Sequence, residues 1–234
     1  CVPHCHLIAL YEADKIRLYV MDLTTGEKND FSEGFDQNAE GLKWGDDNTI
    51  WFISDWHATD EIYSLDIPTG RITKHTDGVH NYTSVIPTGK MLLATKVSMS
   101  KPAESYKVDP ATGKDEELSF VNKPILDQLT MGKVEKRWIK TTDNKDMLVW
   151  MIYPPHFDPN RKYPAILYCE GGPQSTVSQF WSYRWNFQQM AANGYIIVAP
   201  NRRGLPGFGQ EWLEQISGDY SGQNIKDYLS AIDE

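Results

Sequence analysis

Short alternations of apolar and polar residues fill the first half of the chain, and one of them recurs three times. "YVMDLTTG" (19–26), "YSLDIPTG" (63–70) and "YKVDPATG" (106–113) share the pattern Y-x-apolar-D-x-x-T-G, with tyrosines 44 and then 43 residues apart. In a strand, the Tyr and the apolar residue two positions later lie on one face. The Asp can accept a backbone hydrogen bond two residues on, and the Gly tolerates a positive φ. Each copy therefore predicts a strand that ends in a hairpin turn.

Two further strand pairs lie between the copies, at 41–44 with 49–54 and at 83–86 with 90–95. Four short strands in each stretch of about 40 to 45 residues predict the blades of a β-propeller. A plain antiparallel sandwich is the alternative, and the nearly constant spacing of the three turns favours the propeller. Because two full blades and part of a third cannot close a propeller, we expect further blades upstream of residue 1.

From residue 134 the pattern changes to strands that alternate with helices. Segments 134–141 and 147–155 predict a strand pair, while "AILYC" (165–169) and "YIIVAP" (195–200) are apolar runs typical of strands buried on both faces. Between these runs, apolar residues recur at the spacing of an α-helix. They are Phe180, Tyr183, Phe187, Met190 and Ala191. This predicts a strand-helix-strand unit with an apolar helix face in its core.

A second helix is expected at the end of the chain, in "NIKDYLSAIDE" (224–234), where one face has Ile225, Tyr228, Leu229 and Ile232. It stops without the glycine or proline that usually ends a helix. We place the domain boundary between residues 125 and 126 and expect the chain to be truncated at both ends.

Composition and charge narrow the functional classes. Hydrophobic residues make up 40% and charged residues 24% of the chain, as in a soluble globular protein, and the formal net charge is -9. No basic surface is available for phosphates, so neither nucleic acid nor an anionic membrane is an expected partner. The three cysteines are too few for a disulfide framework. Cysteine and histidine side chains, which can bind zinc, occur close together at Cys1, His4, Cys5 and His6. They do not form the two separated pairs of a structural zinc site, so we expect no metal and no cofactor.

Three stretches in the second half, "KYPAILYCEGGPQ" (162–174), "NGYIIVAPNRRGLPGFGQEW" (193–212) and "GDYSGQNIKDYLSAID" (218–233), carry a family resemblance. They resemble the prolyl oligopeptidase family of serine peptidases, especially its bacterial dipeptidyl-peptidase and acylaminoacyl-peptidase-like branch. The resemblance covers about half the chain, and the repeats agree with it over the other half. It implies partial β-propeller blades over 1–125 and the N-terminal part of an α/β-hydrolase domain over 126–234.

The resemblance also gives a role to the turn after residues 165–169. In such enzymes this turn faces the nucleophile, and a side chain just before the glycines helps to bind the oxyanion. Glu170 and Gly171 are therefore candidate oxyanion or substrate-binding residues. The family usually has His or Tyr at this position, whereas Glu donates a hydrogen bond only when protonated. Glu170 could be a protonated donor, could turn away and leave the oxyanion to backbone N–H groups, could bind the substrate's amino terminus, or could be purely structural.

No catalytic residue is assigned in this chain. The G-x-S-x-G nucleophile elbow would be expected some tens of residues after "SAID", with the family's Asp and His later still, and the sequence has no such elbow. His156 lies in a loop composition and is expected to be exposed. The serines that lack the elbow frame in the second half are Ser175, Ser178, Ser182, Ser217, Ser221 and Ser230.

The function implied by the resemblance is a serine exopeptidase that releases short N-terminal units, dipeptides above all, from oligopeptides through an acyl-enzyme. A non-catalytic propeller module that binds a protein, with a degenerate hydrolase half, is the alternative, and an esterase on the same fold is a third. The expected partner is an oligopeptide substrate, and homo-oligomer formation stays open. The family branch implies a periplasmic or secreted location, with the cytoplasm as the alternative.

Overall fold

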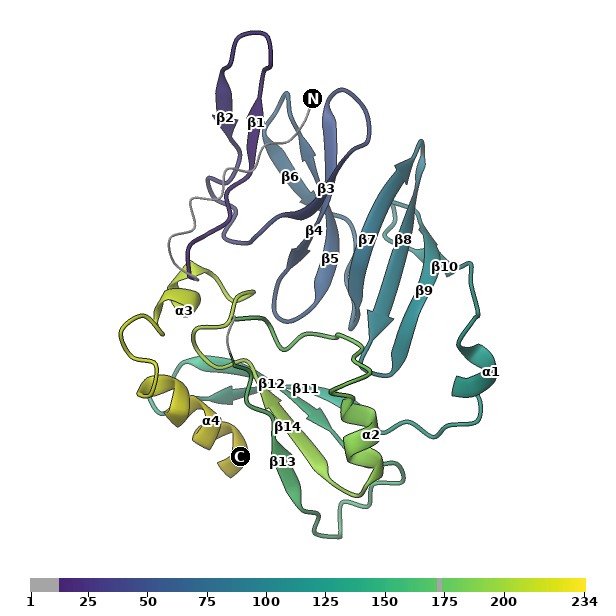
Figure 1. Ribbon diagram of the computed structural model, residues 1–234, viewed down its shortest axis with the longest axis vertical. Helices are drawn as coiled ribbons and strands as arrows, with labels where there is room; N and C mark the ends of the chain where they lie inside the picture. The colour runs from purple at the N-terminus through teal and green to yellow at the C-terminus, as the bar shows by residue number, and fades with distance from the viewer. Residues whose placement is uncertain (1–12, 172–173) are drawn as a thin grey trace.

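The computed structural model describes residues 13–171 and 174–234, so the cysteines and histidines at 1–6 and the pair Gly172–Pro173 lie outside the described residues. Strands in two sheets, one of two and one of eight strands, occupy one side of the molecule, and they pair antiparallel except where Asp60 pairs with Asn81. A four-stranded sheet with most of the helices occupies the other side (Figure 1). The strands of the first group, which we call the antiparallel region, are β1 (Tyr19–Met21), β2 (Lys28–Asp30), β3 (Glu40–Trp44), β4 (Thr49–Asp55), β5 (Asp60–Asp66), β6 (Arg71–Lys74), β7 (Asn81–Thr88), β8 (Met91–Ser98), β9 (Lys101–Val108) and β10 (Asp115–Glu117).

The three repeated segments each form a strand and a hairpin turn, as predicted. Asp22 accepts from the N–H of Thr24 at 2.7 Å, and Asp109 accepts from the N–H of Ala111 at 2.9 Å. In the middle copy, position 68 is a proline without an N–H, and Asp66 accepts from the N–H of Thr69 instead, at 3.0 Å. The glycines that close the three turns have φ values of 75°, 70° and 71°. The local chemistry of the repeat therefore sets these turns.

The second group of strands forms a mixed sheet in the order β11-β12-β14-β13. Its strands are β11 (Val134–Lys140), β12 (Asp146–Ile152), β13 (Ala165–Leu167) and β14 (Ile196–Pro200), and the helices of the chain are α1 (Lys123–Leu126), α2 (Phe187–Ala192), α3 (Gln210–Glu214) and α4 (Gln223–Asp233). β11, β12 and β14 pair antiparallel, whereas β13 and β14 pair parallel. The described strands thus change from the eight-stranded sheet to the mixed sheet between β10 and β11. The two-domain division at residue 125 stays a prediction.

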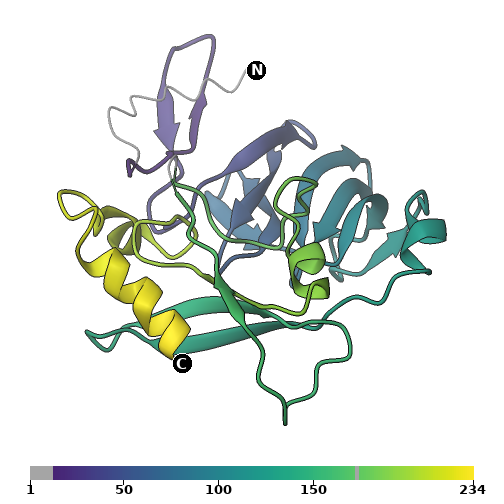
Figure 2. The same ribbon diagram turned by 60° about the horizontal axis from the view of Figure 1, so that its bottom comes forward.

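Both faces of the mixed sheet are covered, because its apolar residues alternate between two cores. On β12, Leu148 and Trp150 join a core with Phe187 of α2 and with Ala58 and Met99 of the antiparallel region. On the other face, residues from β12 and β14 pack against α3 and α4. α2 therefore lies between the mixed sheet and the antiparallel region, and α4 lies along the opposite side of the sheet (Figures 1 and 2).

The helix expected between the two apolar runs is much shorter than the apolar spacing suggests. α2 begins only at Phe187, where Asn186 caps it by accepting from the N–H of Gln189, so Phe180 and Tyr183 lie outside the helix. Tyr183 is 82% exposed, which contradicts its place in a core stripe. The extended course of the segment is fixed by tertiary contacts, since the Ser178 hydroxyl accepts from Asn81 Nδ2 at 2.8 Å.

The helix expected at 224–234 is present as α4, but of the residues expected on its apolar face only Tyr228 is buried. Asn224, Asp227, Tyr228 and Ala231 are buried, whereas Ile225, Leu229 and Ile232 are 44%, 54% and 36% exposed.

Among the described residues, no helix has the length and apolar character needed to cross a membrane.

Candidate active site

The candidate turn follows directly from the parallel edge strand of the mixed sheet. β13 pairs with β14, and the N–H of Tyr168 donates to the Val198 carbonyl at 2.8 Å, which extends the pairing by one residue. The chain then leaves the sheet at Cys169 and reaches Glu170 and Gly171. A Cβ added to Gly171 would meet no described heavy atom within 4 Å, so the turn is open on that side. A turn at the carboxyl end of a parallel strand is where ligands bind in open α/β sheets.

The Glu170 carboxylate is held at both oxygens by hydroxyl groups. Tyr168 Oη donates to Glu170 Oε2 at 2.7 Å, and Ser175 Oγ donates to Oε1 at 2.9 Å. Burial, and then the hydrogen bond to this carboxylate, raises the pKa of Tyr168 far above its usual range, so the phenol stays a donor. Glu170 thus links the strand before the turn to the segment after it.

The Glu170 carbonyl is held from the opposite side by two buried side chains. Arg202 Nη2 donates to it at 3.0 Å, and Tyr228 Oη of α4 donates to it at 2.8 Å. Arg202 Nε also donates to Tyr228 Oη at 3.1 Å, which closes a triangle of hydrogen bonds around this carbonyl. Both acceptor sites of one turn carbonyl are therefore occupied.

The neighbouring Arg203 has a different environment. Its Nε donates to Asp227 Oδ2 at 2.9 Å, and its Nη2 donates to Asp143 Oδ1 at 2.7 Å. Arg203 lowers the pKa of Asp143 well below the usual range of a carboxyl group. Asp227 is fully buried on α4, and Asp143 lies in the turn between β11 and β12. Arg203 therefore joins these two elements through its two ion pairs. Arg203 is thus an ordinary paired buried charge.

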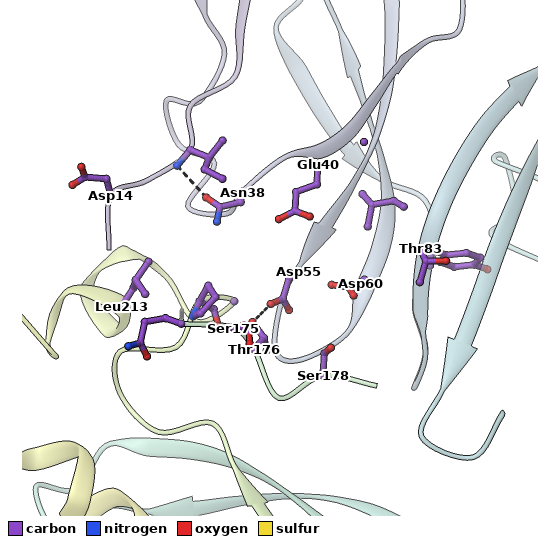
Figure 3. A pocket seen from close by; sticks show the side chains of 17 residues that line it. Asp14, Asn38, Glu40, Asp55, Asp60, Thr83, Ser175, Thr176, Ser178 and Leu213 are labelled. Carbon is purple, nitrogen blue, oxygen red and sulfur yellow. Dashed lines mark hydrogen bonds between the residues drawn. The ribbon is translucent and has the colours of Figure 1, made fainter. Parts of the chain in front are cut away.

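A cavity of about 700 Å³ lies beside the turn, between the antiparallel region and the segment that follows Pro173 (Figure 3). Asp55 and Asp60 point into it from the ends of β4 and β5, Glu40 from β3, and Ser175 and Thr176 from the other side. Among the residues that line it, four are acidic (the fourth is Asp14) and none is a lysine or arginine. The cavity therefore offers carboxyl groups and no cationic side chain to a ligand.

The two aspartates are brought together by a tight hairpin. His57 and Ala58 have φ values of 54° and 63°, and the turn places Asp55 directly opposite Asp60 in the β4–β5 register. Burial raises the pKa of Asp55 to about 7 although Thr176 donates a hydrogen bond to it. Burial, and then the charge of Asp55, raises the pKa of Asp60 to about 8. The hairpin thus holds two carboxyl groups that resist ionisation together.

The residues singled out from sequence have different outcomes. Glu170 and Gly171 lie at the turn after β13 and are not among the residues that line the cavity, and their candidate role in binding the oxyanion or the substrate stays a prediction. His156 is exposed in a loop, as expected. The metal-ligand types at residues 1–6 lie outside the description, and within it no group of three or more His, Cys, Asp or Glu side chains could hold a metal.

Sequence inspection did not place Arg202, Tyr228, Asp55 or Asp60 at the site, although Tyr228 was expected on the apolar face of the last helix. A signal was present for Arg202, because "NRRG" directly follows an apolar strand and a basic pair at the end of such a strand must find buried acceptors. For Asp55 and Asp60 the sequence has only a short acidic hairpin. The hydrogen bond between Thr176 and Asp55 joins positions 121 residues apart, which no local pattern indicates.

Comparisons with known proteins give three kinds of match. The family model described as "Prolyl oligopeptidase family" matches residues 181–234. Dipeptidyl-peptidase 5 from Porphyromonas gingivalis is 49% identical over 96% of this chain and 33% of that protein. Dipeptidyl-peptidase 5 from the fungus Arthroderma otae is 29% identical over 93% of this chain and 31% of that protein.

Solved structures share the fold. Pyrococcus horikoshii acylaminoacyl peptidase superposes with a TM-score of 0.81 at 22% identity, over 96% of this chain and 34% of that chain. Porphyromonas gingivalis dipeptidyl peptidase 4 superposes with a TM-score of 0.71 at 22% identity, over 93% and 32%. The chain spans about a third of the length of each of these relatives.

Proposed function

Since this chain belongs to the prolyl oligopeptidase family, we propose that it is a portion of a serine exopeptidase. The longer protein releases short N-terminal units, chiefly dipeptides, from oligopeptides through an acyl-enzyme. Support comes from the Porphyromonas gingivalis relative named dipeptidyl-peptidase 5, with which nearly the whole chain aligns. Because the chain spans about a third of that relative, the nucleophile and its base belong to the remainder of the longer protein.

The same proposal gives the two sheets their places in the longer protein. The antiparallel region supplies blades of a β-propeller, and the mixed sheet is the N-terminal part of an α/β-hydrolase domain. The parallel pairing of β13 with β14, and the helices on both faces of their sheet, support the second assignment.

One observation carries the assignment of the site. The turn at Glu170 and Gly171 stands at the carboxyl end of a parallel strand, is fixed by four hydrogen bonds through Glu170, and is joined through Ser175 to the cavity at the antiparallel region. A fixed turn can aim donors at negative charge that develops in a transition state. Gly171 lets the backbone approach the substrate closely.

Glu170 takes the structural role among those left open by the sequence. Its carboxylate accepts from Tyr168 and Ser175, so both oxygens already have donors within the turn. The oxyanion is then left to the backbone N–H of Gly171. This removes the conflict of a carboxylate beside a forming oxyanion.

The substrate of the longer protein is an oligopeptide, with neither metal nor organic cofactor in the reaction. The acidic cavity suits a peptide better than it suits a nucleic acid or an anionic membrane. We place the protein in the periplasm or outside the cell.

Peptide digestion followed by mass spectrometry tests the function. The full-length protein is incubated with two synthetic oligopeptides of one sequence, one with a free and one with an acetylated amino terminus. Successive loss of dipeptides from the free peptide alone is expected. Removal of the acetylated first residue instead would favour an acylaminoacyl peptidase, and no cleavage of either peptide would favour the binding-module alternative.

A further inference from the structure

Arg202 is a buried cation without a carboxylate. It is 1% exposed, and within the described residues no acidic side chain lies within ion-pair distance of it. Its guanidinium donates instead to Tyr228 Oη and to the carbonyls of Arg203, at 2.9 Å, and Glu170. Burying a charge costs stability unless hydrogen bonds satisfy it. An arginine that serves only packing would therefore be poorly placed here.

The contrast with Arg203 sharpens this point. Arg203 is 3% exposed and is neutralised by Asp227 and Asp143, so its contacts explain its burial. Arg202, one residue earlier, donates through Nη2 to the Glu170 carbonyl, which lies 32 residues earlier in the sequence. What distinguishes the two arginines is that Arg202 reaches the candidate site.

Tyr228 completes the contact from a separate element. It is 7% exposed on α4, and its hydroxyl accepts from Arg202 while it donates to the Glu170 carbonyl. The hydroxyl thus has one donor and one acceptor, each within hydrogen-bond distance. Three segments, the end of β13, the loop after β14 and α4, meet at this one carbonyl oxygen.

We propose that Arg202 and Tyr228 are positioning residues, which hold the Glu170 carbonyl so that the backbone N–H of Gly171 is aimed at the reacting carbonyl of the substrate. This inference rests on the proposed function. The peptide plane that carries the Glu170 oxygen also carries the Gly171 N–H. Anchoring the oxygen therefore fixes the direction of that N–H without any contact between Arg202 or Tyr228 and the substrate.

Removing the anchor should affect the transition state more than the ground state. A donor that acts on the oxyanion stabilises charge that appears only during reaction, so its loss lowers kcat and leaves KM nearly unchanged. A small displacement of such a donor costs about 10- to 100-fold in rate.

The test uses the full-length protein with Tyr228→Phe and Arg202→Lys, assayed for kcat and KM on a dipeptidyl substrate. Tyr153→Phe is the matched control, because Tyr153 is also buried and its hydroxyl accepts from an arginine, Arg137, at 2.7 Å, but it is not at the turn. Tyr228→Phe should lower kcat about tenfold with KM within about twofold, and Tyr153→Phe should leave both unchanged.

The variants also separate positioning from folding. Arg202→Lys keeps the charge but cannot bridge Tyr228 and the carbonyl in the same way, so its loss and that of Tyr228→Phe should be less than additive in the double variant. If Arg202→Lys fails to fold, Tyr228→Phe, which removes a single oxygen, still decides. If Tyr228→Phe and Tyr153→Phe lowered kcat equally, or if Tyr228→Phe left kcat unchanged, the inference would be overturned and the proposed function would stand. An inactive wild-type protein would overturn the proposed function and the inference with it.

Discussion

At the scale of single residues, the site depends on positions where backbone and side chains come unusually close. Gly207 has a φ of 82°, and its carbonyl accepts from the N–H of His57 at 2.8 Å. A Cβ at Gly207 would lie 2.4 Å from Asp55 Oδ2. The loop after β14 can therefore contact the β4–β5 hairpin only if this position has no side chain.

Gly207→Ala should destabilise the protein by about 1–3 kcal/mol, because it adds backbone strain and a clash with a buried carboxyl group. Gly89→Ala is the control, since Gly89 has a similar φ of 77° and a Cβ there would meet nothing within 4 Å. Chemical denaturation of both variants measures the difference. Equal losses would mean that the close contact with Asp55 contributes nothing.

Glu170 gives a second test at this scale. Glu170→Gln keeps an acceptor for one hydroxyl, and we expect kcat within about threefold of wild type in the full-length protein. Glu170→Ala frees both Tyr168 and Ser175 and should lower kcat about tenfold with little change in KM. A rise in KM for peptides with free amino termini, with none for blocked ones, would assign Glu170 to amine binding instead.

At the scale of elements, prediction succeeded where local chemistry decides and failed where distant contacts decide. The three hairpin turns follow from Asp and Gly at fixed positions, and even the shift from residue 68 to Thr69 follows from a proline. The segment 175–186 has the apolar spacing of a helix, but Ser178 and Gln179 bind Asn81 and Met99 of the antiparallel region. Those partners lie 80 or more residues away, so the spacing alone predicted the wrong structure.

The β4–β5 hairpin should make stability depend on pH. The pKa of Asp55 is raised to about 7 and that of Asp60 to about 8, each from a usual value of 3.8. Between pH 3.8 and about 8 the folded state binds more protons than the unfolded state, because the two carboxyl groups lose their protons at a higher pH when the protein is folded. The stability that these groups contribute is therefore complete below pH 3.8 and is lost as the pH rises through 7 to 8.

Asp55→Asn removes one ionisation and keeps an oxygen that can accept from Thr176. We expect it to raise the thermal midpoint by about 2–4 °C at pH 8.5, which corresponds to roughly 1 kcal/mol, and by less at pH 5. The exposed Asp47→Asn on the preceding hairpin serves as control. The same midpoint change for Asp55→Asn at both pH values would contradict buried, proton-linked carboxyl groups.

At the scale of the whole molecule, the segment after the turn joins the antiparallel region through polar contacts at the edge of the candidate site. Asn81 at the start of β7 binds Ser178, and Asp55 binds Thr176. Further along the chain, the Ser100 hydroxyl accepts from Gln188 Nε2 of α2 at 2.8 Å. Sequence could indicate both sheets and the turn, but not this junction, because its partners come from separate halves of the chain.

The division of labour between this chain and the longer protein can be tested with an activity probe. A fluorophosphonate reacts only with a serine that a base activates, and no G-x-S-x-G frame occurs in residues 1–234. We expect the full-length protein to be labelled once per molecule and this chain alone to stay unlabelled.

Arg202→Lys in the full-length protein should be labelled more slowly but to the same extent, because the anchor affects the rate of acylation and not the presence of the nucleophile. Stoichiometric labelling of a serine in this chain alone would contradict the expectation that the nucleophile lies in the rest of the protein. Mass spectrometry of the labelled peptide identifies the serine in either case.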